Sequence, residues 1–386
     1  MASDAASGQF QEVFGSVSDL RIARTRRHEL MDILFIALTA MISGAEDYVT
    51  IAEFGRIKQE WFEKLLGLPN GIPSHDTFQR VFARIDPKQL EKCLISWSEH
   101  LRSRIAISGE EVVALDGKTL RHSFDTAMDV GAIHIVSAWA SRARLCLGQI
   151  KVSEKSNEIT AVPALLMMLD VKDCLATADA MNCQRATAEQ ITRQGGTFVL
   201  ALKANQATLF EGAKLFAEHA AKLKYEGYTV STESTIDKGH DRIETRTNLV
   251  IELPEGVARE TEKQAWPGLR SVGIVRSTRQ LGDKTTTETR YFLTAIQTDA
   301  ANSAKRFARA VRWHWGIENS LHWVLDVCFN EDDCRVRKDH RPENLAVIRH
   351  LALNLLGRDT TTRAGIKTRR LKAGWNEPYL EHLLLN

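Results

Sequence analysis

Three carboxylates stand where the sequence otherwise predicts buried apolar structure. Asp116 follows the apolar run at residues 112–115, and Asp179 follows a second apolar run at 174–178. Glu318 lies within the apolar stripe of a predicted helix. A carboxylate in an apolar setting is costly unless a cation or hydrogen-bond donors compensate it. Three acids in such positions therefore predict a metal site.

The prediction for Glu318 has an alternative. Phe307, Val311, Trp315 and Leu325 recur at helical spacing around it, so we expect this face to pack on a sheet. A glutamate on such a face can instead form a buried ion pair with an arginine. Two aspartates at predicted strand ends favour the metal site, because neighbouring parallel strand ends are where such folds place ligands.

Other familiar catalytic motifs are absent from the sequence. The segment Gly117-Lys-Thr119 resembles the end of a phosphate-binding loop, but Val112 occupies the place of its first glycine. No H-E-x-x-H zinc motif surrounds His314 or His322, and no G-x-S-x-G elbow is present. Asp326 is expected to be a helix-end or solvated charge, with the metal pocket as a less favoured position.

The elements that must position these residues can be read from periodicity. Residues 28–100 show helical spacing, with Ser74 and Asp86-Pro87 as helix starts, and predict either a helix-turn-helix reader of DNA or a plain helical bundle. Strands are expected near 111–116, 133–140, 144–152, 174–178 and 197–202, with helices at 157–169 and 184–194, which indicates a mixed α/β sheet. Residues 228–298 are typical of β-hairpins inserted before the helix that carries Glu318.

Composition indicates a reduced, cytoplasmic protein. The 386 residues contain 44% hydrophobic and 26% charged residues, no segment resembles a membrane span or signal peptide, and the six cysteines form no C-x-x-C pair. Net charge is only +2, so a nucleic-acid surface requires local clusters of basic residues. Such clusters occur in residues 21–27, 335–341 and 358–372. Three clusters in a nearly neutral chain favour a polyanionic partner.

Several sequence blocks resemble the DDE transposases of bacterial insertion sequences, particularly the H-repeat-associated (ISAs-type) family. The blocks are Leu115-Asp-Gly-Lys-Thr-Leu-Arg121, Glu154-Lys-Ser-Asn-Glu-Ile159, Thr177-Ala-Asp-Ala-Met181, and His314-Trp-Gly-Ile-Glu-Asn-Ser-Leu-His-Trp-Val-Leu-Asp326. Gly71-Ile-Pro-Ser-His-Asp-Thr-Phe-Gln-Arg-Val-Phe82 is similar to the helical domain associated with that family. The resemblance runs from about residue 20 to about residue 357.

The resemblance implies an α/β fold with a ribonuclease H-like catalytic core and a β-rich insertion, preceded by an all-helical N-terminal domain. The expected divisions are a basic segment at 1–27, a helical domain at 28–106, the catalytic domain at 107–357 with its insertion at 228–298, and a basic tail at 358–386. Asp116, Asp179 and Glu318 become the catalytic triad. Three carboxylates suit two Mg²⁺ or Mn²⁺ ions, with Asp116 shared by both. Double-stranded DNA is the expected partner, and a homo-oligomer is expected to bind it. No association with a membrane is expected.

The resemblance is incomplete around Glu318. The wider superfamily often carries a Y-(2)-R-(3)-E-(6)-K pattern in which Glu318 would be the glutamate. In this sequence, Val311, His314 and Leu325 occupy the positions of its Tyr, Arg and Lys. Phosphate contacts from that pattern therefore cannot be transferred. The candidate DNA-binding residues are instead Lys118, Arg121, Arg335, Arg337, Lys338, Arg369 and Arg370. Lys118 and Arg121 have the alternative of pairing with a nearby acid.

Three functions remain open from the sequence. The first is a transposase that cleaves element ends and joins their 3′-hydroxyls to target DNA. The second is a nuclease of the same fold that only hydrolyses DNA. The third is a DNA-binding remnant or domesticated protein without catalysis.

Overall fold

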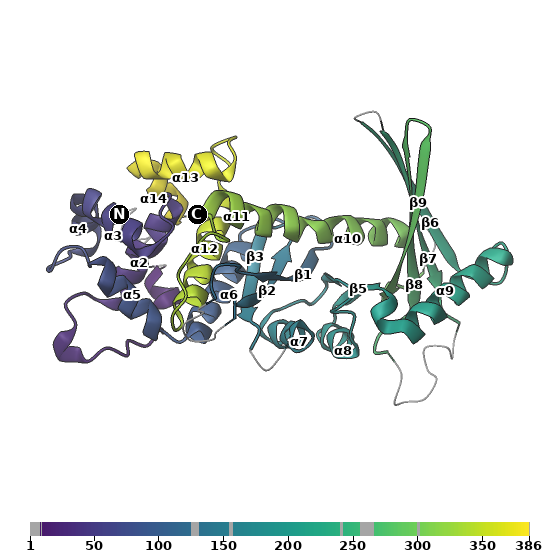
Figure 1. Ribbon diagram of the computed structural model, residues 1–386, viewed down its shortest axis with the longest axis horizontal. Helices are drawn as coiled ribbons and strands as arrows, with labels where there is room; N and C mark the ends of the chain where they lie inside the picture. Colours follow the sequence, from purple (N-terminus) through teal and green to yellow (C-terminus); the bar gives the residue numbers. More distant parts are fainter. Residues whose placement is uncertain are drawn as a thin grey trace.

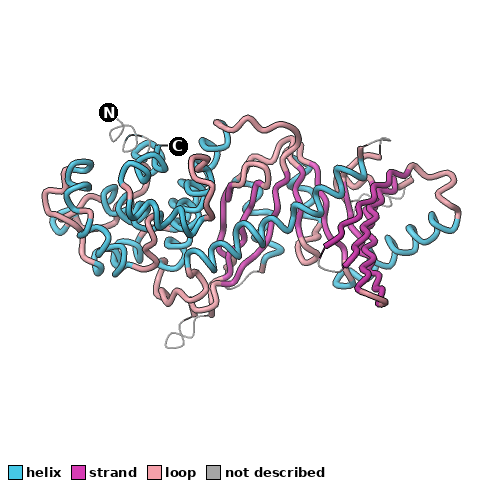
Figure 2. Tube along the Cα trace, turned by 90° about the horizontal axis from the view of Figure 1, so that it is seen from above, coloured by secondary structure: helices cyan, strands magenta, loops and turns pink. Residues whose placement is uncertain are grey.

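The computed structural model describes residues 8, 10–124, 131–153, 157–239, 242–254, 266–298 and 302–385. Residues 154–156 of one sequence block, and residues 1–7 and 9 of the expected basic segment, therefore lie outside the described residues. Helices gather at one end of an elongated molecule, a sheet occupies its middle, and long β-hairpins form the other end (Figures 1 and 2).

The N-terminal region is helical, as the sequence predicted. Ser74 caps α5 (His75–Arg84) through the backbone N–H of Thr77, and Asp86 caps α6 (Pro87–Ser103), which opens with Pro87. The helix α2 (Leu30–Ile42) is buried along almost its whole length. The elements are the short 3₁₀ turn η1 (Ala23–Thr25), then α2 (Leu30–Ile42), α3 (Tyr48–Ile57), α4 (Gln59–Leu66), α5 (His75–Arg84) and α6 (Pro87–Ser103).

The sheet that follows confirms the predicted mixed α/β fold. Its first five strands lie in the order β3-β2-β1-β4-β5, in which β2 is antiparallel to both neighbours and β4 and β5 are parallel to β1. All five strands lie where apolar runs predicted strands. The two helices, α7 and α8, lie where helical spacing predicted helices. The elements are β1 (Val112–Thr119), β2 (His134–Ala140), β3 (Leu145–Lys151), α7 (Glu158–Met168), β4 (Leu175–Ala178), α8 (Arg185–Arg193) and β5 (Thr197–Leu202).

The β-rich insertion continues this sheet. Its last strand pairs antiparallel with β5, from Val199 opposite Thr294 to Leu202 opposite Tyr291, so one sheet of nine strands results. Between β5 and the insertion, the chain forms a 3₁₀ turn, η2 (Ala204–Gln206), and then a helix, α9, that periodicity did not predict. The elements are α9 (Ala207–Lys222), β6 (Val230–Gly239), β7 (Arg242–Glu252), β8 (Ser271–Leu281) and β9 (Lys284–Thr294).

A long helix, α10 (Ser303–Ile317), crosses one face of the sheet, while α7 and α8 cover the opposite face (Figure 1). Phe307 of α10 packs so closely on β8 that a Cβ at Gly273 would lie 2.4 Å from its ring. The glycine therefore permits the close approach of helix and sheet. A π-helical turn, η4 (Glu318–His322), and α11 (Trp323–Phe329) continue from α10 towards the N-terminal helices.

The C-terminal segment, predicted as a basic tail at 358–386, forms packed helices in its described part. After α12 (Arg341–Arg358), the chain forms α13 (Ile366–Trp375) and α14 (Glu377–Leu385). Leu380, Leu383 and Leu384 are buried in the core, and the indole Nε1–H of Trp61 in α4 donates to Glu381 at 2.9 Å. Apolar positions between the basic residues thus anchor this segment on the N-terminal helices.

Two further features concern compartment and membranes. The six cysteine thiols are free, and four of them are buried. Among the described helices, none combines the length and the apolar character needed to cross a bilayer.

Candidate active site

Asp116 and Asp179 are brought together by the parallel pairing of β1 and β4. Leu115 lies opposite Ala178, the last residue of β4, and an aspartate follows directly after each of these two residues. The sequence placed the end of β1 at Asp116, but β1 continues to Thr119 because β2 pairs with it along that length. It is β4 that ends here, and its end opens space beside Asp116.

Glu318 reaches the same place from the junction of α10 and the π-helical turn. Phe307, Val311 and Leu325 are buried, as the apolar stripe predicted. Trp315 is 54% exposed, which corrects its expected packing on the sheet, and the side chain of Glu318 is 51% exposed. Both side chains line a cavity next to the sheet instead of the core.

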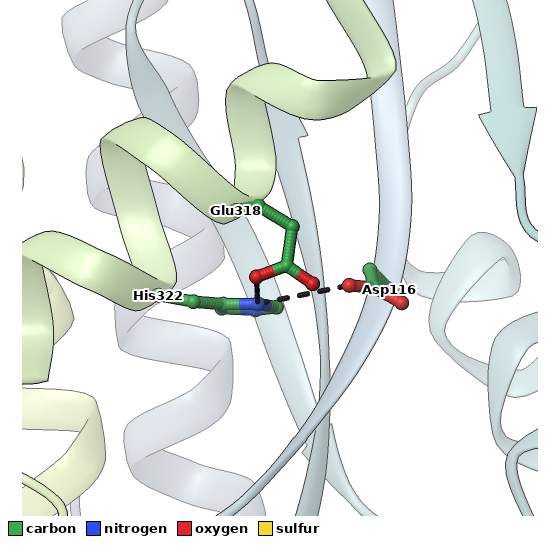
Figure 3. Close-up of side chains that lie close together, drawn as sticks. All are labelled: Asp116, Glu318 and His322. Carbon is green, nitrogen blue, oxygen red and sulfur yellow. Dashed lines mark ion pairs between the residues drawn. The ribbon is translucent and has the colours of Figure 1, made fainter. Parts of the chain in front are cut away.

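The three acids share one cavity of about 670 Å³, which Thr177 and His314 also line. Next to two of these acids, Nδ1 of His322 lies 3.5 Å from Oε2 of Glu318 and 3.7 Å from Oδ2 of Asp116 (Figure 3). One ligand atom from each of Asp116, Glu318 and His322 falls within 4.8 Å of the others. Asp179 lines the cavity outside this tight group.

The cavity is lined by basic as well as acidic side chains, since Lys203 and Arg290 border it together with the three acids. Burial raises the pKa of Asp116, and the hydrogen bond and charge of Glu318, with the charge of Asp179, raise it further. Burial lowers the pKa of His322 and of His314, despite the attraction of nearby carboxylates. Both imidazoles therefore favour the neutral form, and neither supplies positive charge to the three acids.

The fold and this acidic cavity agree with the comparison to known proteins. Residues 107–355 match the family described as "Transposase DDE domain", and residues 11–98 match the one described as "DDE_Tnp_1-associated". The chain belongs to the DDE transposase family.

Similar proteins cover most or nearly all of the chain. It is 37% identical over 379 residues to "H repeat-associated putative transposase YhhI" of Escherichia coli, covering 97% of each chain. It is 41% identical over 281 residues to "Uncharacterized protein in dhlA 3'region" of Xanthobacter autotrophicus, covering 72% of this chain and 91% of that one. A solved synaptic complex of piggyBac transposase with hairpin DNA aligns with a TM-score of 0.41 at 11% identity, over 98% of this chain and 78% of that one. That likeness is too distant to support an argument.

Two of the chain's candidate DNA contacts pair with acids. Nζ of Lys118 contacts Asp326 and lies 3.0 Å from Glu331 and 3.2 Å from Asp332. Arg121 also reaches Asp332, at 3.2 Å, but its side chain is 78% exposed. Lys118 is thus paired with acids, as its structural alternative predicts, and Asp326 pairs with this lysine and does not line the cavity of the three acids.

The remaining candidates divide into exposed and buried residues. Arg335 and Lys338 are exposed, and Arg337 donates to the carbonyl of His122 at 3.0 Å while its guanidinium lies over the ring of Phe124. Their contact with DNA remains a prediction.

Arg370 corrects the prediction made for it. Its side chain is buried and donates to the carbonyls of Met41, Ala45 and Cys328, so it is not available to DNA in this conformation. Arg369 is mostly buried and donates to the carbonyls of Leu356 and Thr362 at 2.7 and 2.8 Å. Both belong to the packing of α13, whose side chains the sequence placed on a tail.

Sequence reasoning missed three residues next to the acids. His134, Glu158 and Asn182 form a hydrogen-bonded group beside Asp179. Glu158 lay within a block quoted for the family resemblance, and that was the available signal. The roles of His134 and Asn182 depend on contacts across the sheet, which no local pattern reveals.

Proposed function

We propose that this chain is the DNA transposase of an insertion sequence, which cleaves the ends of its element and joins their 3′-hydroxyls to target DNA. The observation that carries the proposal is the convergence of Asp116, Asp179 and Glu318 on one cavity. Membership of the DDE transposase family supports the same reaction. A nuclease that only hydrolyses, and a DNA-binding protein without catalysis, are the alternatives that the experiment below must separate.

The residues of the cavity fit a site for divalent cations. Carboxylate oxygens are the ligands that Mg²⁺ and Mn²⁺ prefer. Burial, then the hydrogen bond and charge of Glu318 and the charge of Asp179, raise the pKa of Asp116, so a nearby cation would favour its ionised form. We assign Asp116 to both of two ions, with Asp179 and Glu318 each completing one. Bound ions of this kind activate the attacking oxygen and stabilise the leaving oxygen of a phosphodiester.

The chain's own residues prepare the cavity for that chemistry. Asp116 lies opposite Ser137 of β2, and the residue before it pairs with Ala178 of β4, so its position does not depend on a loop. Oγ1 of Thr177 and Nδ1 of His314 are 3.0 Å apart, which fixes one wall beside Asp179. The cavity volume is in the range of sites that enclose small-molecule ligands, so a nucleotide-sized part of a strand can enter it.

The proposed partner is double-stranded DNA, bound by a homo-oligomer at the element ends and the target. Arg335 and Lys338 are exposed on the segment that follows α11, close in sequence to the acids that pair with Lys118. Phosphate contacts from such residues release counterions, so affinity for duplex DNA should fall steeply as salt rises.

The test uses duplex DNA that carries the sequences flanking the coding region, with Mg²⁺ or Mn²⁺. We expect strand cleavage and joining by the native chain, and neither in a chelator or in the variants D116N, D179N and E318Q. Because Gln keeps the shape of Glu318, the E318Q variant should still bind DNA. Among the described residues, Glu318 pairs with His322 and with no buried arginine, so E318Q should not lower the melting temperature of the metal-free protein.

Each other result identifies an alternative. Cleavage without joining on every substrate tested would assign the chain to the hydrolytic nucleases. DNA binding without cleavage in the presence of either Mg²⁺ or Mn²⁺ would assign the chain to the DNA-binding proteins without catalysis. Full cleavage in a chelator, or a fully active E318Q variant, would contradict the metal site proposed here.

A further inference from the structure

Asp179 is held in place by a neighbour that is completely buried. The backbone N–H and the side-chain Nδ2 of Asn182 both donate to Oδ1 of Asp179, each at 3.0 Å. Nδ2 also donates to Oε2 of Glu158 at 2.9 Å. Asn182 is 0% exposed, so water does not compete for these bonds. Its amide therefore bridges two carboxylates.

Glu158 connects this bridge back to β1. Its Oε1 lies 2.5 Å from Nε2 of His134, and Nδ1 of that histidine lies 2.8 Å from Oγ1 of Thr119. Glu158 opens α7 and is itself 8% exposed. A chain of polar contacts thus runs from the end of β1, through a helix N-terminus, to the aspartate that follows β4.

Gly117 provides the space for this chain of contacts. A Cβ at that position would lie 2.3 Å from Nε2 of His134 and 2.5 Å from Oε1 of Glu158. Any other residue would displace the pair. The glycine next to Asp116 therefore allows the His134–Glu158 contact to lie directly against the strand that carries the acid.

The charge on Glu158 determines how the amide of Asn182 is oriented. Burial alone would raise the pKa of Glu158, but hydrogen bonds from His134 and Asn182 lower it below its ordinary value. An ionised Glu158 accepts hydrogen bonds only. A rotated amide would turn its carbonyl oxygen towards two carboxylates, so the NH₂ group must face them.

We propose that Glu158, Asn182 and His134 are positioning residues that fix the carboxylate of Asp179 for metal binding. Oδ1 of Asp179 receives both bonds from Asn182, and no described residue donates to Oδ2, which is left for an ion. Both oxygens of Glu158 are occupied by its two partners, so Glu158 acts through Asn182. This inference rests on the proposed function only in requiring that the acids bind a divalent cation.

The test measures Mn²⁺ binding to the full chain by calorimetric titration, without DNA. N182A and E158A should weaken Mn²⁺ binding about tenfold, as expected when a partner that orients a metal ligand is lost. E158Q should retain affinity within about threefold, because its carbonyl accepts from Asn182 while its NH₂ donates to the other tautomer of His134. The D116N variant removes one proposed ligand, so the Mn²⁺ binding that it loses relative to the native chain is the binding in this cavity.

A matched control comes from another buried asparagine. Asn354 is also 0% exposed, and its Nδ2 donates to the carbonyl of Cys146 at 2.8 Å and to Ser98 at 3.1 Å. N354A should lower stability as N182A does, yet leave Mn²⁺ affinity unchanged. If N182A does not fold, N182S removes the bridge to Glu158 while filling more of the space.

The possible results either support or overturn the proposal. An affinity unchanged in N182A or N182S would reduce the group to ordinary packing. An E158Q variant as weak as E158A would make Glu158 a metal ligand. A native chain that binds no Mn²⁺ in this cavity would also overturn the inference. Mn²⁺ binding that follows the expected pattern without any DNA cleavage would support the positioning role while the proposed function fails.

Discussion

Replacing Lys118 by methionine decides whether this residue contacts DNA or stabilises the fold. Its side chain is 12% exposed and lies among Asp326, Glu331 and Asp332. Although burial alone would lower the pKa of Lys118, Glu331 and Asp326 raise it above its ordinary value. The K118M variant keeps most of the side-chain volume but leaves the acids without their shared cation.

The expected loss of stability follows from what remains after the change. Removing one partner of a buried ion pair costs about 3–5 kcal/mol. Glu331 retains Arg349, whose Nη1 lies 3.6 Å away, and the side chains of Asp326 and Asp332 are 31% and 22% exposed. We therefore expect the lower end, about 3 kcal/mol, which corresponds to a fall in melting temperature of about 6 °C for a large domain.

The assay is a thermal melt beside a DNA-binding titration at two salt concentrations. R121M is the matched control, because Arg121 contacts the same Asp332 at 3.2 Å from a side chain that is 78% exposed. An exposed pair contributes less than about 1 kcal/mol, so R121M should melt close to the native chain. A K118M variant that melts normally and binds DNA with a smaller salt dependence would refute the structural role and restore the phosphate contact.

Two further predictions concern other buried groups. Burial and the charge of Glu343 raise the pKa of Glu91 to about 7, so the folded state pays for ionising it and loses stability as pH rises from about 4.5 to 7. The E91Q variant cannot ionise at this position, so it should be more stable than the native chain by up to about 3 kcal/mol at pH 8, with little difference at pH 4.5. Urea unfolding at the two pH values measures this. Equal differences in the free energy of unfolding at both pH values would contradict the prediction. G117A should displace His134 and Glu158 and weaken Mn²⁺ binding about tenfold in calorimetry. Unchanged binding would show that the pair can move without disturbing Asp179.

Much of the fold follows from the sequence because its signals are local. The apolar runs at 112–115 and 174–178 predicted two buried strands, and each run led directly to an acid. Helical spacing predicted the N-terminal helices and α10, because a helix that packs on one side must repeat its apolar positions. The carboxylates themselves were conspicuous by type, since few acids interrupt apolar segments.

The neighbours of each side chain were decided only by the tertiary structure. Arg369 and Arg370 looked like a basic tail, but α13 packs against the N-terminal helices and buries Arg370 among carbonyl oxygens. Lys118 meets Asp326 across 208 positions of the chain. The spacing of residues along the sequence does not predict contacts between residues so far apart.

The same limit explains what was missed at the site. The sequence by itself determined which acids stand at the ends of apolar runs and which elements carry them. The antiparallel pairing of β9 with β5, and the contact of Asn182 with both Glu158 and Asp179, arise where separate elements pack together. Local periodicity fixes how an element folds and which side it buries, whereas the partner of a polar group depends on which other element reaches that side.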